Sequence, residues 1–218
     1  KGYWRNDGLN TTWKNIHDPG THDATLANGT ETILIPAGVD SSRDSQGFLM
    51  NRQRNTSSLN SINDNGIGGT EYKGGTAAVN SSSLDITSDF SICCWVKLVD
   101  KNNSYNIIQK KSGWNYDGYG IYYHHTNNKW YFEYADDEGS TPTTDGSKNK
   151  QLSHNDLSMD LDAWYFICVT HDDSGNDVQY QAKYSSSSMD QTKTHSSALA
   201  SVGTNTESLS IGQGVGGS

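Results

Sequence analysis

The sequence predicts an all-β protein, a two-sheet antiparallel β-sandwich with very little helix, and two observations carry this prediction. No stretch repeats apolar residues with the period of a helix, whereas short apolar runs recur between polar turns. The turns are marked by residue pairs that favour reversals, such as Asp117-Gly118 and Asn127-Asn128. No polar gap separates two apolar cores in the 218 residues, so we expect a single domain over residues 1–218.

Strands are predicted where apolar residues cluster between these turns. They are Ile33–Ile35, Phe90–Leu98, Tyr105–Gln109, Gly120–His124, Lys129–Tyr134, Trp164–Thr170, Val178–Tyr184 and Ser208–Ile211. Residues 36–89 and 185–207 are low in apolar content, which predicts loops or short strands. The strand at 164–170 is apolar on both faces, which predicts a central strand that is covered on both sides. Alternation and aromatic content predict that the largely buried residues include Phe90, Ile92, Val96, Trp130, Phe132, Trp164 and Phe166.

Composition excludes several classes of partner. The chain has 16 basic and 25 acidic residues and a net charge of −9, whereas nucleic-acid binding requires a basic face. The same charge disfavours docking on anionic lipid. No apolar run approaches the ~18 residues of a membrane span. The 6 Trp and 12 Tyr residues indicate a folded domain, because disordered chains lack aromatic residues.

Three segments resemble motifs of laminin-G-like domains. They are FSICCWVK at 90–97, WYFICVTHD at 164–172 and LSIGQ at 209–213. Laminin-G-like domains are grouped with pentraxins and concanavalin A-like lectins and glucanases, so the resemblance implies a jelly roll over about residues 13–213. The opening at 2–8 is similar to modules of phage structural proteins.

The same resemblance implies that a strand is missing at the C-terminal end. Family members continue past the "I-G" strand to a closing strand, whereas this sequence ends at Gly216-Gly217-Ser218. We therefore expect the closing strand to come from elsewhere. An open edge or groove is expected beside its usual partner, because an unpaired strand is a template for another chain. Residues 2–5, another chain or missing sequence are the candidates to fill it.

Catalysis is not predicted. A glycosidase needs two carboxylates that face one bond, and Glu133, Asp136, Asp137 and Glu138 form the one cluster that contains glutamates. In that cluster Asp136 falls on the opposite face from Glu133, so the spacing favours a solvated turn. The protein is therefore expected not to be an enzyme.

A calcium ion is the cofactor that the sequence allows. The segment 13–26 lies where laminin-G-like relatives often carry a polar loop, and Asp18 and Asp23 are its candidate Ca²⁺ ligands. The pattern Asp172-x-Ser174-x-Asn176 also resembles a calcium loop. It lacks the glycine and the glutamate that such a loop needs at its sixth and twelfth positions, so a hairpin turn is predicted there.

Aromatic residues near one predicted turn form the candidate ligand site. Sugar rings stack on exposed aromatic faces, and polar side chains bond their hydroxyl groups. The candidate glycan-binding residues are Trp114, Tyr116, Asp117, Tyr119 and Tyr131. The alternative for Trp114, Tyr116 and Tyr119 is that they pack against a thin core.

The three cysteines can form at most one bridge. Cys93 and Cys94 are adjacent on a predicted strand and point to opposite faces, so only one of them can meet Cys168. The pentraxin resemblance implies that Cys93 and Cys168 lie on neighbouring strands and face the same way, where a disulfide is possible. Buried free thiols remain the alternative.

Two functions follow as hypotheses, and both place the chain outside a cell or on a virion surface. The first is a non-catalytic module for glycan binding or adhesion, whose partner is a glycan or a surface protein. The second is a structural or decoration module of a virion or fibre that contacts other protein chains, including further copies of itself. Neither hypothesis involves nucleic acid or a membrane.

Overall fold

The computed structural model describes much of the chain in short ranges. These are residues 12–13, 20, 23–27, 30–34, 46–50, 52–54, 72–74, 76–79, 82–98, 101, 104–111, 116–136, 149–153, 158–174, 176–184, 186–196 and 202–212. The chain divides into two compact units, one of Lys1–Ser81 with Ser208–Gly217 and one of Ser82–Glu207. The expectation of one domain stays a prediction, and residues 2–5, offered as a closing strand, lie outside these ranges.

The first unit consists of short antiparallel strands. Four of them pair in the order β1 (Thr12–Trp13), β2 (Ala24–Ala27), β7 (Thr76–Val79) and β16 (Leu209–Gly212). Two further pairs are β3 (Thr30–Leu34) with β4 (Gln46–Met50) and β5 (Arg52–Arg54) with β6 (Tyr72–Gly74). The strands expected near Ile33 and Leu209 are therefore present: β16 lies within one residue of its predicted bounds, and β3 begins three residues before and ends one residue before the predicted strand.

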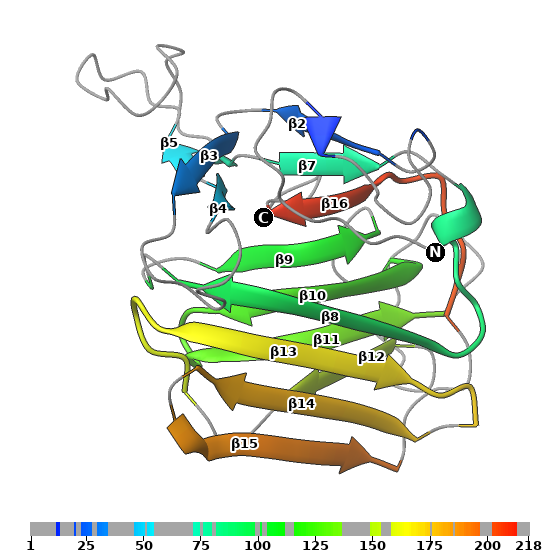
Figure 1. Ribbon diagram of the computed structural model, residues 1–218. Helices are drawn as coiled ribbons and strands as arrows, with labels where there is room; N and C mark the ends of the chain where they lie inside the picture. The colour runs from blue at the N-terminus through cyan, green and yellow to red at the C-terminus, as the bar shows by residue number, and fades with distance from the viewer. Residues whose placement is uncertain are drawn as a thin grey trace. The chain divides into compact units, whose positions relative to one another are not determined.

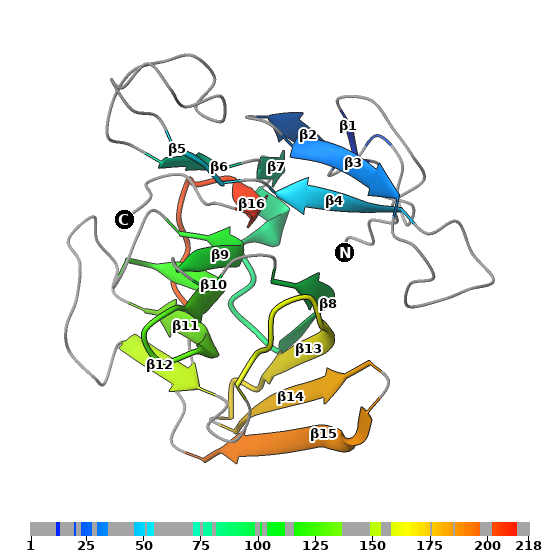
Figure 2. The same ribbon diagram turned by 90° about the vertical axis from the view of Figure 1, so that its left-hand side faces the viewer.

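The second unit contains a sandwich of two four-stranded antiparallel sheets (Figures 1 and 2). The β9–β12 sheet has the order β9 (Tyr105–Lys110), β10 (Gly118–His124), β11 (Lys129–Ala135), β12 (Asn149–Ser153). The β8–β15 sheet has the order β8 (Phe90–Lys97), β13 (Trp164–His171), β14 (Asp177–Lys183), β15 (Ser186–His195). Within the described ranges the one helix is a 3-10 turn at Ser82–Leu84. The all-β, two-sheet prediction is confirmed.

Aromatic residues from both sheets meet in the sandwich core. Trp130 and Phe132 alternate with outward residues along β11 and are fully buried, as predicted. The Phe90 ring of β8 lies edge-on to Phe132, with 6.1 Å between ring centroids. Ile92 and Val96 face the same interior but are half-buried. They lie on β8, which ends the strand order of its sheet.

The face of β13 was predicted wrongly. Tyr165, Ile167 and Val169 are fully buried, whereas Trp164 and Phe166 point away from the core and are half-exposed. Because every position of this strand is apolar or nearly so, hydrophobicity alone does not decide which set faces inward. The strand is central in its sheet, as predicted. Its outward residues are half-exposed or exposed, so the expected cover on both faces is not found among the described residues.

The neighbouring strand β14 reverses the usual pattern of polarity, because its polar residues face the core. Asp177, Gln179 and Gln181 are fully buried. Gln179 Nε2 donates to the Leu152 carbonyl at 2.9 Å, Asp177 Oδ1 lies 2.9 Å from His171 Nδ1, and Gln181 Oε1 accepts a hydrogen bond from Trp130 Nε1. Buried polar groups are tolerated when they are hydrogen-bonded, so these partners fix the face that β14 turns inward.

A disulfide joins the centre of β8 to the centre of β13. Cys93 and Cys168 lie directly opposite each other in the two strands, and their Cα atoms are 4.0 Å apart. The sequence-based placement of these cysteines on neighbouring strands is confirmed. The bridge lies on the outer face of the sheet, and the strands β9 to β12 all fall between its two cysteines in the sequence.

The free thiol of Cys94 faces inward, and we expect it to be unreactive in the folded chain. Burial raises the pKa of this thiol to about 12, and the nucleophile in alkylation is the thiolate. Iodoacetamide near neutral pH, without reductant, should leave the folded protein unmodified and add one group per chain in denaturant, as measured by mass spectrometry. Modification of the folded protein would contradict this. Since the pKa is raised on folding, the thiol's contribution to stability is complete below its ordinary pKa of 9.0 and declines as the pH rises towards 12.

None of the helical structure in the described part of the chain has the length and apolar character needed to cross a membrane.

Candidate functional site

The structure separates the residues predicted to bind sugar. Trp114 lies outside the described residues, and Tyr116 is half-buried. Tyr119 is buried: its ring centroid lies 5.0 Å from that of Phe90, and its hydroxyl donates to the Leu84 carbonyl at 2.9 Å. The packing alternative therefore describes Tyr119, which presents no ring face to a ligand.

Asp117 is also buried rather than exposed at a turn. A Cβ atom added to Gly203 would lie 2.7 Å from the Asp117 carboxyl carbon, so the 203 backbone packs directly against this side chain. Asn205 Nδ2 donates to the Asp117 carbonyl at 2.9 Å. Gly118 follows with a φ of 111°, a conformation that favours glycine. The predicted turn is present, but Asp117 forms part of its support.

Tyr131 belongs instead to an aromatic cluster on the side of the β9–β12 sheet that points away from the core. We call this cluster the hairpin face and define it as Asn106, Tyr122, His124, Asn127 and Tyr131. Tyr122 and Tyr131 lie opposite each other in β10 and β11, and their rings stack with centroids 5.1 Å apart. The His124 ring lies 6.0 Å from that of Tyr131. Tyr131 and His124 are half-exposed, and the buried Tyr122 supports them.

Two amides flank the rings of the hairpin face. Asn127 Nδ2 donates to the Tyr131 hydroxyl at 2.7 Å, and Asn106 lies opposite Tyr122 in β9. The turn that carries Asn127 is held by His125, whose Nδ1 lies 3.1 Å from Ser104 Oγ. Sequence reasoning missed Asn106, because only the strand register shows which residue of β9 lies beside Tyr122.

A buried ion pair lies on the same side of the sheet. Lys111 Nζ donates to Glu133 Oε1, and both side chains are buried. Burial lowers the pKa of Lys111, while the Glu133 carboxylate acts in the opposite direction. Burial, with smaller contributions from Glu133 and Tyr131, raises the pKa of Tyr122, so its hydroxyl keeps its proton. The Glu133 carboxylate is therefore compensated by a buried cation.

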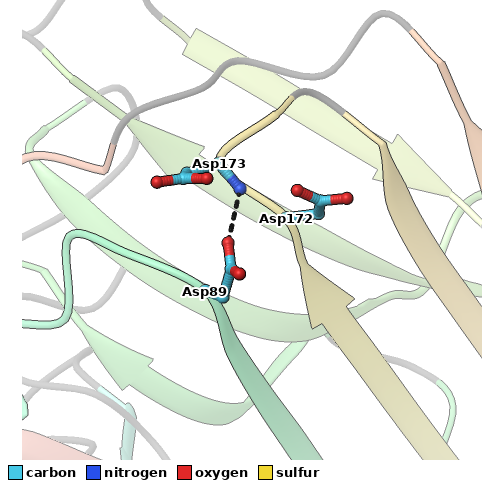
Figure 3. A group of neighbouring side chains, drawn as sticks. All are labelled: Asp89, Asp172 and Asp173. Atoms are coloured by element: carbon cyan, nitrogen blue, oxygen red, sulfur yellow. Dashed lines mark hydrogen bonds between the residues drawn. The ribbon is translucent and has the colours of Figure 1, made fainter.

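A cluster of acidic residues lies where β13 turns into β14 (Figure 3). Carboxylate oxygens of Asp89, Asp172 and Asp173 lie within 4.8 Å of one another. Asp89 Oδ1 accepts from the Asp173 backbone N–H at 2.9 Å, and Asp172 Oδ1 accepts from that of Ser174 at 2.8 Å. Hydrogen bonds from Ser174 lower the pKa of Asp172. The bond from Ser174 to Asp172 is that of an Asx-type turn, so the predicted hairpin turn is confirmed.

The calcium prediction stays a prediction. Asp18 lies outside the described residues, and Asp23 directly precedes β2 in the first unit.

The two antiparallel sheets and their strand order define a jelly-roll module. Residues 70–218 match a laminin-G family that is described as the Concanavalin A-like lectin/glucanases superfamily. The chain belongs to this superfamily.

Solved structures of similar fold include two toxin binding domains. One is the binding domain of Paraclostridial Mosquitocidal Protein 1, with a TM-score of 0.54 and 15% identity over 94% of this chain and 42% of that chain. Another is the binding domain of Botulinum Neurotoxin DC in complex with SialylT, with a TM-score of 0.50 and 16% identity over 94% of this chain and 42% of that chain. The chain thus spans about two fifths of their length. A search of curated protein sequences finds no match.

Proposed function

We propose that this chain is a non-catalytic glycan-binding module of an extracellular or virion-surface protein, and that the hairpin face is its ligand site. The observation that carries the proposal is the half-exposed Tyr131 and His124 rings, with Tyr131 stacked on the buried Tyr122 and with amides on either side. Aromatic rings beside a few polar groups are the composition of a sugar site.

Each part of the hairpin face has a distinct role in the proposal. Tyr131 and His124 offer ring surface to the apolar face of a pyranose, while Tyr122 holds the Tyr131 ring in place from behind. The amides of Asn106 and Asn127 are within reach of the same surface and supply donors and acceptors for sugar hydroxyls. Of the predicted glycan-binding residues that the structure describes, Tyr131 is the one that lies in this site.

The comparisons support the same class of ligand. The description of the superfamily includes lectins, and one similar domain is described in complex with SialylT. Because the chain carries a net charge of −9, a general electrostatic attraction to anions does not select the ligand.

Replacing Tyr131 with alanine tests the site. We expect the variant to bind the glycans that the unaltered chain captures on a glycan array, but between about twofold and tenfold more weakly, because one ring contact contributes ~0.5–1.5 kcal/mol. Isothermal titration with the best array ligand measures the change. Tyr131→Phe keeps the ring and should lose less, and Thr126→Ala in the same turn is the matched control.

The outcome that would contradict the proposal is an array without any bound glycan from a chain that forms stable oligomers. That result favours the alternative, a structural or decoration module whose contacts are with other chains. Running the array with calcium and with EDTA also tests the predicted cation: dependence on calcium that is lost in Asp18→Asn and Asp23→Asn would place it there.

A further inference from the structure

A second aromatic surface covers the outer face of the β8–β15 sheet. We call it the outer strip and define it as Trp95, Phe166, Tyr180, Ala182 and Tyr184. Trp95 and Phe166 lie opposite each other in β8 and β13, with ring centroids 5.4 Å apart. The Tyr184 ring lies 6.2 Å from that of Trp95, and the Tyr180 ring lies 6.0 Å from that of Phe166.

The strand register places a small residue in the middle of these rings. Ala182 lies opposite Phe166 in β14, and alternation places it between Tyr180 and Tyr184 on the outer face. The row of residues across the strands is therefore Trp95, Phe166 and Ala182, with a tyrosine on each side of Ala182. Ala182 therefore contributes the smallest side chain of this row, a single methyl group.

The disulfide supports the strip from one side. Cys93 and Cys168 occupy the next outward position along β8 and β13, and Tyr180 lies opposite Cys168. This covalent bond between the two strands fixes the spacing of Trp95 and Phe166, which lie two residues away from it. The rings are thus presented by a rigid sheet and not by a loop, which lowers the entropic cost of binding a ligand.

The exposed area of the strip fits a small ligand better than a protein. Trp95 is 43% exposed and Tyr184 is 44% exposed. Because an aromatic side chain presents ~150–250 Å², these fractions leave about 100 Å² on each ring, and the half-buried Phe166 and Tyr180 add less, as does Trp164 on the same outer face. The total of a few hundred Å² is well below the ~800 Å² per partner of a specific protein interface.

The charge of the strip fits a neutral ligand. Among the outward residues of β8, β13 and β14, all of which are described, Lys97 is the one charged side chain, and its Nζ lies 3.5 Å from Asp162 Oδ1. At the other end the outward residues Ser91 and Thr170 are hydroxyls, 3.0 Å apart. The strip therefore offers rings and hydroxyls without a free cation, although the whole chain carries a net charge of −9.

We propose that the outer strip is a second carbohydrate site, which binds a neutral glycan chain by stacking its sugar rings across β8, β13 and β14. Two stacking positions lie on either side of Ala182, one on Trp95 with Tyr184 and one on Phe166 with Tyr180. A sugar that bridges these positions passes over the methyl group of Ala182, where a larger side chain would stand in its way. Acidic glycans are disfavoured, because Lys97 is already paired with Asp162.

The test uses the whole chain and a set of neutral hexasaccharides: cellohexaose, maltohexaose, mannohexaose and N-acetylchitohexaose, with sialyllactose as the acidic comparison. Isothermal titration gives affinities, and the Trp95 indole N–H resonance, assigned through its loss in Trp95→Ala, reports contact with the strip.

We expect at least one neutral hexasaccharide to bind and shift this resonance. Trp95→Ala and Ala182→Arg should each weaken binding by about fivefold or more. Leu161→Ser, at an exposed apolar residue outside the strip, is the matched control.

Several results would overturn the proposal. One is that no neutral hexasaccharide binds. Another is that a hexasaccharide binds but both Trp95→Ala and Ala182→Arg keep its affinity unchanged. A third is that the chain dimerises and Ala182→Arg abolishes the dimer. If Trp95→Ala fails to fold, the affinity of Ala182→Arg for the hexasaccharides tests the proposal, because the Ala182 side chain lies outside the core. The Tyr131→Ala variant separates this proposal from the hairpin face, since it should leave the Trp95 shift unchanged even if every other glycan signal is lost.

Discussion

Replacing Trp130 with alanine is expected to lower the free energy of unfolding by ~3–5 kcal/mol, because the substitution removes a large buried ring and leaves a cavity. Trp130 is 0% exposed, and its indole N–H donates to Gln181 Oε1 in the opposite sheet. Gln181 Nε2 is buried and has no hydrogen-bond partner among the residues that the structure describes. The variant therefore also leaves both ends of a buried amide without a partner, which adds a desolvation cost.

Urea denaturation measures this effect, and a second tryptophan provides the control. Trp95→Ala removes the same side chain from an exposed position on the outer strip and is expected to change the free energy of unfolding by ~1 kcal/mol or less. Trp130→Phe restores most of the packing but not the hydrogen bond to Gln181, so it should fall between the two. Equal losses for Trp130→Ala and Trp95→Ala would show that Trp130 is not a core residue.

Reduction of the Cys93–Cys168 disulfide is expected to cost about 4 kcal/mol in the chain-entropy account, because the bridge joins residues that are 75 positions apart. Urea curves with and without dithiothreitol measure the loss. A double Cys93→Ala, Cys168→Ala variant should have the reduced protein's stability under both conditions, and Cys94→Ala should keep the response to reductant. A parent chain that is indifferent to dithiothreitol would show that the bridge does not form in solution.

The strands that could be predicted from the sequence are those that are rich in apolar residues. The predicted strands at 90–98, 105–109, 120–124, 129–134 and 164–170 agree with β8, β9, β10, β11 and β13 to within two residues. The strand β15 was missed, because Ser186–His195 is mostly serine, threonine and charged residues. It lies at the end of its strand order, where pairing with β14 supplies the stabilisation that apolar burial does not.

The faces of β13 and β14 could not be predicted from hydrophobicity. By alternation alone, Val178, Tyr180 and Ala182 are the better candidates for the core. The structure buries Asp177, Gln179 and Gln181 instead, because His171, Leu152 and Trp130 supply their hydrogen bonds. Such partners come from distant parts of the chain, so the sequence pattern of one strand does not reveal them.

The candidate site was located only in part, for a related reason. The sequence indicates that aromatic residues near the Asp117-Gly118 turn, with Tyr131 on the adjoining strand, are candidates, and Tyr131 lies on the hairpin face. It does not show that Tyr119 and Asp117 are buried, since the Leu84 carbonyl and Gly203 that cover them lie far away in sequence. Asn106 and the outer strip depend on strand register across three strands, which local composition does not encode.

The position of the disulfide in the sequence has a consequence for cleavage of the chain. The bridge closes a covalent ring that contains the whole β9–β12 sheet, since strands from Tyr105 to Ser153 lie between Cys93 and Cys168. A protease that cuts one peptide bond within this ring produces two fragments that stay attached to each other. The oxidised protein therefore remains a single covalent molecule after such a cut, and its fragments separate only when a reductant is added.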